Sequence, residues 1–270
     1  MRTPISRLTT ALAVPLLAGS LSAQQASQSS LVLSVGLGVH TGHGLWTIPS
    51  QPLALLNANP PVYDSLRLVR SISPGIMATV SGTYFPSAYV GVNGSVTFLD
   101  MSMENACRPV GPYVVDFQEK NRQTCENLDG TVSSNSAIVL GLGVTLRAAP
   151  RGGASPYLRA GIGYAIHSSG TIGMSSTYVV SGSQISRQIL AEESPLGGSF
   201  AGQFGVGITQ PFASGYQLRL EVRDDFMGFE QAAGPANALG QLPTGRGWYH
   251  HWALTIGLDI VLERTRARRY

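Results

Sequence analysis

The sequence predicts an all-β fold: a closed, antiparallel, up-and-down transmembrane β-barrel of about eight strands. Three observations predict it. Eight stretches alternate bulky apolar residues with small or polar ones, the links between these stretches alternate between short and long, and the chain begins with an export signal. Alternation is the pattern of a strand with two different faces, because successive residues of a strand point to opposite sides.

The first 23 residues have the features of a secretory signal peptide. Arg2 and Arg7 precede a short apolar stretch, and small residues up to Ala23 supply a cleavage site. The stretch is short and Pro15 interrupts it, so it does not fit a membrane-spanning helix. We therefore expect a signal peptide at 1–23 and one barrel domain at 24–270. Without the leader, basic and acidic residues nearly balance, and nucleic acid is not an expected partner.

The clearest strand is residues 138–147, "IVLGLGVTLR". One face of this strand carries the bulky apolar residues Ile138, Leu140, Leu142, Val144 and Leu146. The other face carries Val139, Gly141, Gly143, Thr145 and Arg147, which are mostly small or polar. A helix would scatter these residues around its axis. The same alternation recurs along the chain, giving eight expected strands at 31–40, 75–84, 90–98, 138–147, 158–167, 200–209, 216–223 and 252–262.

The links fall into two classes. Three are short turns, at Pro86 and Ser87, at 149–156 and at 210–216. Four are long, at 41–70, 101–134, 168–197 and 227–247. Long loops without secondary structure are unusual in compact soluble domains. Short turns in the periplasm and long loops outside are typical of transmembrane barrels, so we expect four long extracellular loops and, after the last strand, a short basic tail.

Alternation alone leaves open whether the bulky face meets lipid or a core. The opposite face is rich in Gly and Ser, which suit a narrow interior, so we expect the bulky face to meet lipid. Eight strands enclose an interior filled by side chains, which predicts no open pore. Aromatic residues near both sets of links are expected to form interfacial girdles: Phe85, Tyr89, Tyr157, Phe212 and Tyr216 at the short turns, and Phe98, Phe226, Phe229, Trp248 and Trp252 at the long loops.

Charged residues on the inward face must pair, because an isolated buried charge is very costly. Counting strand positions places Arg147, Arg159 and Arg219 at depths similar to Glu221 and Asp259. We expect an interior charge cluster of these five residues. Asp225 is expected nearer the outer mouth, so Asp259→Ala should cost more stability than Asp225→Ala.

Cys107 and Cys125 lie close together in a polar segment. In an exported protein a disulfide is the expected pairing. A metal site is not expected, because no histidine accompanies them at ligand spacing.

The pattern of eight alternating strands joined by short turns and long loops resembles that of the small outer-membrane barrels typified by the OmpA transmembrane domain and OmpX. In the last stretch, Thr255, Gly257, Ile260 and Leu262 match the signal by which barrel-assembly machinery recognises such proteins. The family usually ends this strand on an aromatic residue, whereas here a basic tail follows. The resemblance implies an outer-membrane location, outer-membrane lipid and the assembly machinery as partners, and a monomer.

Catalytic patterns are few, and we expect neither an enzyme nor a cofactor. His167 and Ser169, with Glu192 or Glu193, resemble the His-x-Ser pair of an outer-membrane lipid A deacylase family, in which His is the general base for Ser. His250 and His251 are interpreted as a strand-end pair. The apolar segment Leu45 to Leu56 leaves open binding or transport of a small apolar ligand, as in OmpW-like proteins. A structural or surface-interaction barrel is the preferred function, with these two as alternatives.

Overall fold

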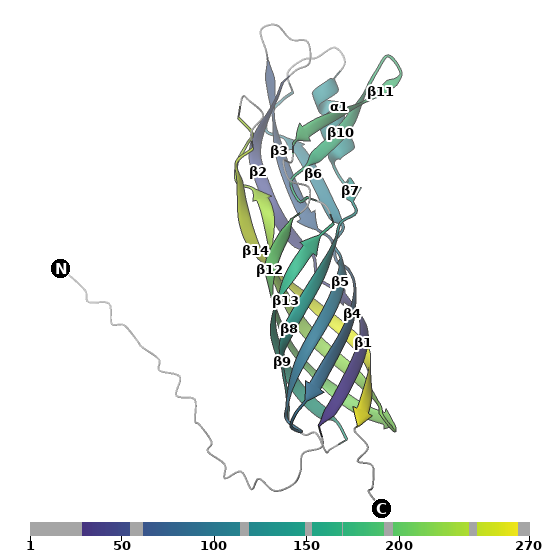
Figure 1. Cartoon of the computed structure of the whole chain (residues 1–270). Coiled ribbons are helices and arrows are strands. Elements are labelled where there is room, and N and C mark those ends of the chain that lie inside the picture. The colour runs from purple at the N-terminus through teal and green to yellow at the C-terminus, as the bar shows by residue number, and fades with distance from the viewer. Residues whose placement is uncertain are drawn as a thin grey trace, which may run out of the picture.

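The computed structural model describes residues 29–54, 62–113, 119–148, 153–168, 170–191, 197–237 and 242–263, and of Glu263 it describes the backbone alone. The expected signal peptide and the basic tail after the last strand lie outside these residues. The described chain forms an elongated molecule, with a barrel at one end and further strands and a helix stacked on the other (Figure 1).

Eight antiparallel strands close the barrel, which confirms the predicted fold. Along the chain each strand pairs with the next one in the barrel, and β1 closes the circle by pairing with both β4 and β14. The strands are β1 (Ser30–His40), β4 (Gly75–Phe85), β5 (Val90–Asp100), β8 (Ser136–Arg147), β9 (Ser155–His167), β12 (Gly198–Ala213), β13 (Tyr216–Ala232) and β14 (Thr244–Glu263). A closed sheet leaves no unpaired edge, as a bilayer requires.

The exterior of the barrel is apolar. Leu142 and Ile162 are 70% and 77% exposed, and apolar side chains of all eight strands are exposed in the same way. A soluble barrel would turn these residues inward. An apolar outer band on a closed, even-stranded antiparallel barrel is the pattern of a membrane-spanning one.

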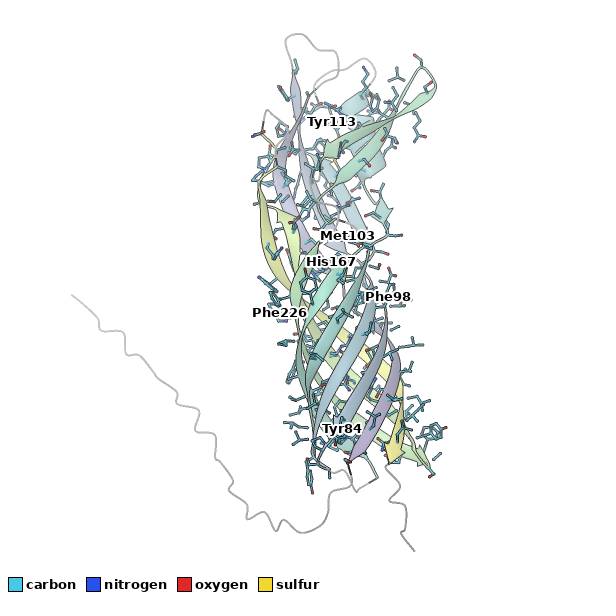
Figure 2. All side chains as sticks on the ribbon, viewed as in Figure 1. Tyr84, Phe98, Met103, Tyr113, His167 and Phe226 are labelled. Carbon is cyan, nitrogen blue, oxygen red and sulfur yellow. A yellow bond between two sulfur atoms is a disulfide. The ribbon has the colours of Figure 1, made fainter. Side chains whose placement is uncertain are left out.

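The expected aromatic girdles are correct in part. Tyr89, Phe212 and Tyr216 are exposed beside the three short turns, at the end of the barrel hereafter called the short-turn end, and Phe98, Trp248 and Trp252 are exposed toward the other end of the barrel. Figure 2 shows Phe98 on that side, and Tyr84, which was not expected in a girdle, near the short-turn end. The prediction was wrong for three members, which are buried inside: Phe85, Tyr157 and Phe229. One step in sequence reverses the face of a strand residue, so proximity to a turn does not decide which side it takes.

The long links are not unstructured loops, which corrects the expectation for this part of the barrel domain. Four further strands form a second sheet in the order β2–β3–β6–β7, namely β2 (His43–Ala54), β3 (Tyr63–Ile72), β6 (Met103–Pro109) and β7 (Val132–Ser133). A hairpin of β10 (Met174–Val180) and β11 (Ser183–Leu190) packs through β10 on the helix α1 (Lys120–Leu128). Together with the ends of β13 and β14 around residues 227–247, these elements make up the cap.

The core of the cap runs directly into the mouth of the barrel. Ile48, Leu66 and Leu68 of the cap are fully buried and belong to the same cluster as Leu99 and Ala137 of the barrel strands. Met103 and His167 lie where the two parts meet, and Tyr113 lies at the far end of the cap (Figure 2). The cap is therefore packed onto the barrel as one structure.

Cys107 of β6 and Cys125 of α1 form a disulfide, as predicted. It joins the helix to the second sheet and closes a loop of 18 residues in sequence. Among the described residues, no helix is both long enough and apolar enough to cross a membrane.

Replacing both cysteines by serine should loosen the cap and leave the barrel folded. A disulfide across a loop of this length contributes about 3 kcal/mol on the chain-entropy model, and here both cysteines lie in the cap. Hydrogen exchange followed by mass spectrometry should show faster exchange in α1 and β6 and unchanged exchange in β8 and β9. Equal loss of protection in β8 would show that the disulfide supports the barrel itself.

Candidate functional site

The inward faces of the eight strands form the lumen, which is polar. Small hydroxyl and amide side chains line most of it, namely Ser34, Thr79, Ser81, Thr83, Asn93, Ser95, Thr97, Thr145, Gln203, Thr209 and Thr255. These residues alternate with the lipid-facing ones along each strand, as the pleat of a sheet requires.

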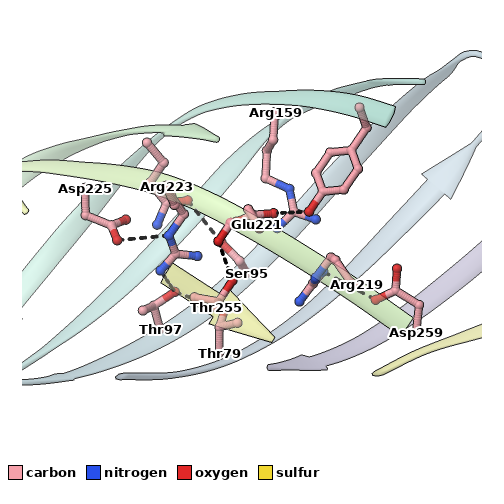
Figure 3. Close-up of polar contacts among 12 residues, drawn as sticks. Thr79, Ser95, Thr97, Arg159, Arg219, Glu221, Arg223, Asp225, Thr255 and Asp259 are labelled. Carbon is pink, nitrogen blue, oxygen red and sulfur yellow. Dashed lines mark hydrogen bonds and ion pairs between the residues drawn. The ribbon is translucent and has the colours of Figure 1, made fainter. Parts of the chain in front are cut away.

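Four of the five predicted cluster residues pair inside the lumen (Figure 3). Arg219 Nη1 lies 3.4 Å from Asp259 Oδ1, and Arg159 Nη1 lies 3.7 Å from Glu221 Oε2. Tyr157 donates a hydrogen bond of 2.5 Å to the same Glu221 oxygen. Each of the four charged side chains is at most 5% exposed, so each charge depends on its partner.

Arg147, the fifth predicted member, is placed differently. It is half-buried at the short-turn end, and its guanidinium carbon lies 3.7 Å from the centre of the Phe85 ring. Among the described residues no carboxylate lies within ion-pair distance of it. Its guanidinium thus makes a cation–π contact that the sequence did not predict.

A second ion pair lies deeper in the lumen and was missed. Arg223 Nε lies 2.9 Å from Asp225 Oδ2, and these side chains are 1% and 0% exposed. Arg223 Nη2 also donates to Thr97 Oγ1 at 3.2 Å. Asp225 was expected nearer the outer mouth, and it does lie on that side of Arg219 and Glu221, but the cap covers this end of the barrel, so its carboxylate is buried.

Glycines make room for the arginines. Gly36 and Gly257 lie opposite each other on β1 and β14, and a Cβ at either would lie 3.1 or 3.0 Å from Arg219 Nη2. Gly257 thus has a packing role in addition to the one expected for it in the assembly signal. Of the other signal residues, Thr255 faces the lumen and Leu262 faces outward, while the recognition of the signal stays a prediction.

Four of the five histidines face inward where the barrel meets the cap. The ring centres of His43 and His251 lie 4.5 Å apart, and His40 donates to the Asp100 carbonyl oxygen at 2.5 Å. His167 packs on Phe229 at 4.7 Å. Burial lowers the pKa of His43 in the cap, and the neighbouring His40 acts in the same direction. Only the fold brings these residues together, since they come from distant parts of the chain.

The expected strand-end pair of histidines is divided between two faces. His250 is exposed, with Nδ1 2.6 Å from Asp224 Oδ2, whereas His251 is fully buried. In the described part of the chain, no group of three or more His, Cys, Asp or Glu side chains is arranged to hold a metal ion.

The residues behind the two alternative functions are placed as follows. His167 is 4% exposed and faces the interior, away from lipid, while Ser169, Glu192 and Glu193 lie outside the described residues. Leu45, Trp46, Ile48 and Leu53 of the apolar segment Leu45 to Leu56 are buried in the core of the cap, and residues 55–61 are not described. The described apolar side chains are thus used in packing.

Two solved structures to which the chain is similar are the outer membrane protein OprG and Neisserial surface protein A. OprG from Pseudomonas aeruginosa is 9% identical with a TM-score of 0.46, over 88% of this chain and 98% of that one. Neisserial surface protein A is 10% identical with a TM-score of 0.43, over 86% and 97% of the two chains. No protein-family model and no curated protein matches the chain.

The topology of the chain itself places it in a class. A closed barrel of eight antiparallel strands, with a filled polar interior and an apolar exterior, is the architecture of the small outer-membrane barrels. The protein is an outer-membrane β-barrel.

Proposed function

We propose that this outer-membrane barrel anchors the cap as a rigid surface for interactions outside the cell, and that it has no open pore. The observation that carries the proposal is the single hydrophobic cluster that joins cap and barrel. A core shared in this way fixes the cap relative to the membrane and fills the mouth of the barrel. A disulfide further restrains the helix of the cap.

The outer face of the second sheet is a candidate contact surface. Arg67 of β3 and Arg108 of β6 lie directly opposite each other, and both are exposed. Like charges in this position destabilise a sheet, and no carboxylate of the described residues lies within ion-pair distance of either. This pairing favours an acidic partner.

Outer-membrane lipid surrounds the apolar exterior in this proposal, and the assembly machinery binds the last strand only during insertion. The barrel acts as a monomer. No catalytic step is assigned, because the imidazole of His167 faces the packed interior.

Absence of a pore can be tested by liposome swelling with arabinose. Liposomes that contain the refolded protein should swell no faster than liposomes without protein. Swelling that increases with the amount of protein would contradict the proposal.

The contact surface can be tested on immobilised dextran sulfate, with neutral dextran as the reference surface. The wild type should be retained on dextran sulfate at low salt, and the Arg67→Ser/Arg108→Ser variant should be retained much less. A matched control removes two other exposed arginines of the cap, in Arg122→Ser/Arg246→Ser, and should bind as the wild type does. Equal loss in both variants would indicate a general charge effect and would rule out this surface.

A further inference from the structure

We propose that the lumen binds one small monovalent inorganic anion, of the size and charge of chloride, between Arg147, Arg159 and Arg219 near the short-turn end. The site is independent of the surface role proposed above. Three features of the described lumen carry it: donors without a hydrogen-bond partner, an excess of positive charge and a small cavity that the three arginines line.

The donors belong to two almost fully buried arginines. Arg159 and Arg219 are 4% and 2% exposed, and Nε and Nη1 of each have no hydrogen-bond partner among the described residues. Their ion pairs, at 3.7 and 3.4 Å, are longer than a charge-assisted hydrogen bond. Buried N–H groups left without an acceptor are costly, so these donors favour an additional acceptor.

The charges near these donors do not balance. Arg147, Arg159 and Arg219 face two carboxylates, those of Glu221 and Asp259, which leaves one positive charge in excess if all are ionised. The deeper pair of Arg223 and Asp225 is neutral by itself. Charge interactions are strong in an interior of low dielectric, and an anion of one negative charge would restore the balance.

The cavity that all three arginines line is small. It leaves about 10 Å³ for the centre of a water-sized particle, about the space that one water molecule needs, so the larger chloride ion enters only with a small shift of the side chains around it. Ser34 and Thr145 line it with hydroxyls that have no partner among the described residues and can donate to an anion. Phosphate, sulfate and organic carboxylates are too large for this space. Asp259 lines the same cavity, and its charge limits the site to one monovalent anion.

The test uses the full mature chain refolded in detergent. Urea unfolding is followed in sodium chloride and in sodium gluconate, whose anion is too large to enter, at matched ionic strength. Chloride should raise the urea midpoint logarithmically, by about 0.5–1 M for each tenfold increase above its dissociation constant, because a ligand that binds only the folded state stabilises it without limit as its concentration rises. Chloride-35 NMR should show line broadening by the protein that bromide reverses.

Two variants locate the site. Arg147→Met removes the excess charge from a half-buried position, so it should fold and lose both the chloride dependence and the broadening. Arg246→Met removes an exposed arginine of the cap and should retain both. Chloride dependence that persists in Arg147→Met would overturn the site. Superimposed chloride and gluconate curves without broadening in the wild type would mean that the cavity holds only water, whatever the variants do.

Discussion

Asp225→Ala is expected to destabilise the barrel by about 3–5 kcal/mol, because it leaves the buried Arg223 charged and without its ion-pair partner. Asp225 is entirely buried, and its carboxylate is the ion-pair partner of Arg223 at 2.9 Å. The urea midpoint of the refolded protein should therefore fall strongly. Asp259→Ala should cost less, since its contact with Arg219 is longer and lies beside a cavity.

A double variant provides the control. Arg223→Met/Asp225→Leu removes both charges together, so it should recover most of the stability that Asp225→Ala loses. A larger effect of Asp259→Ala would restore the ranking expected from sequence. It would contradict the conclusion that the cap seals Asp225 from water.

Leu142→Arg should cost about 2–4 kcal/mol in lipid, the penalty for an arginine on the lipid face of a barrel near mid-membrane. Leu142 lies within β8 and is 70% exposed on the outside of the barrel. In water an exposed apolar residue tolerates this change, so the penalty reports the bilayer. Folding into liposomes under a urea gradient measures it.

Val110→Arg is the matched control, because Val110 is 51% exposed at the end of β6 in the cap. It should change stability by less than about 0.5 kcal/mol. Gly143, on the opposite face of β8, cannot serve as the control position, because a Cβ there would lie 2.3 Å from the Ala160 carbonyl oxygen and any larger side chain would disturb the strand. Equal costs for Leu142→Arg and Val110→Arg would mean that β8 does not face lipid.

The barrel could be predicted from the sequence because lipid and lumen impose a period of two on every strand. Leu142 and Thr145 illustrate it, one exposed and the other buried, as their positions require. The pairing of Arg219 with Asp259 could be estimated by counting residues from the turns. Register fixes depth in a barrel, so such counting is informative.

The cap could not be predicted in this way. Its strands β2 and β3 pair with register shifts around Gly44 and Ile48, and two buried positions of β3 are taken by Asp64 and Arg70, so no unbroken apolar alternation marks them in the sequence. Their burial depends on neighbours from distant links, such as the bond that Trp46 Nε1 donates to the Thr171 carbonyl oxygen. The cap covers Asp225 and His251. Because the cap could not be predicted from the sequence, the burial of these two residues could not be predicted either.

Quenching of single tryptophans by brominated phospholipids tests the central claim, that the eight strands lie in lipid and the cap lies outside it. The chain has three tryptophans, so Phe can replace two at a time. Trp252 is 52% exposed on the barrel exterior, whereas Trp46 is 6% exposed in the cap core. Brominated lipid should quench the variant that keeps Trp252 and leave the variant that keeps Trp46 unchanged. Quenching of Trp46 with no quenching of Trp252 would contradict the account.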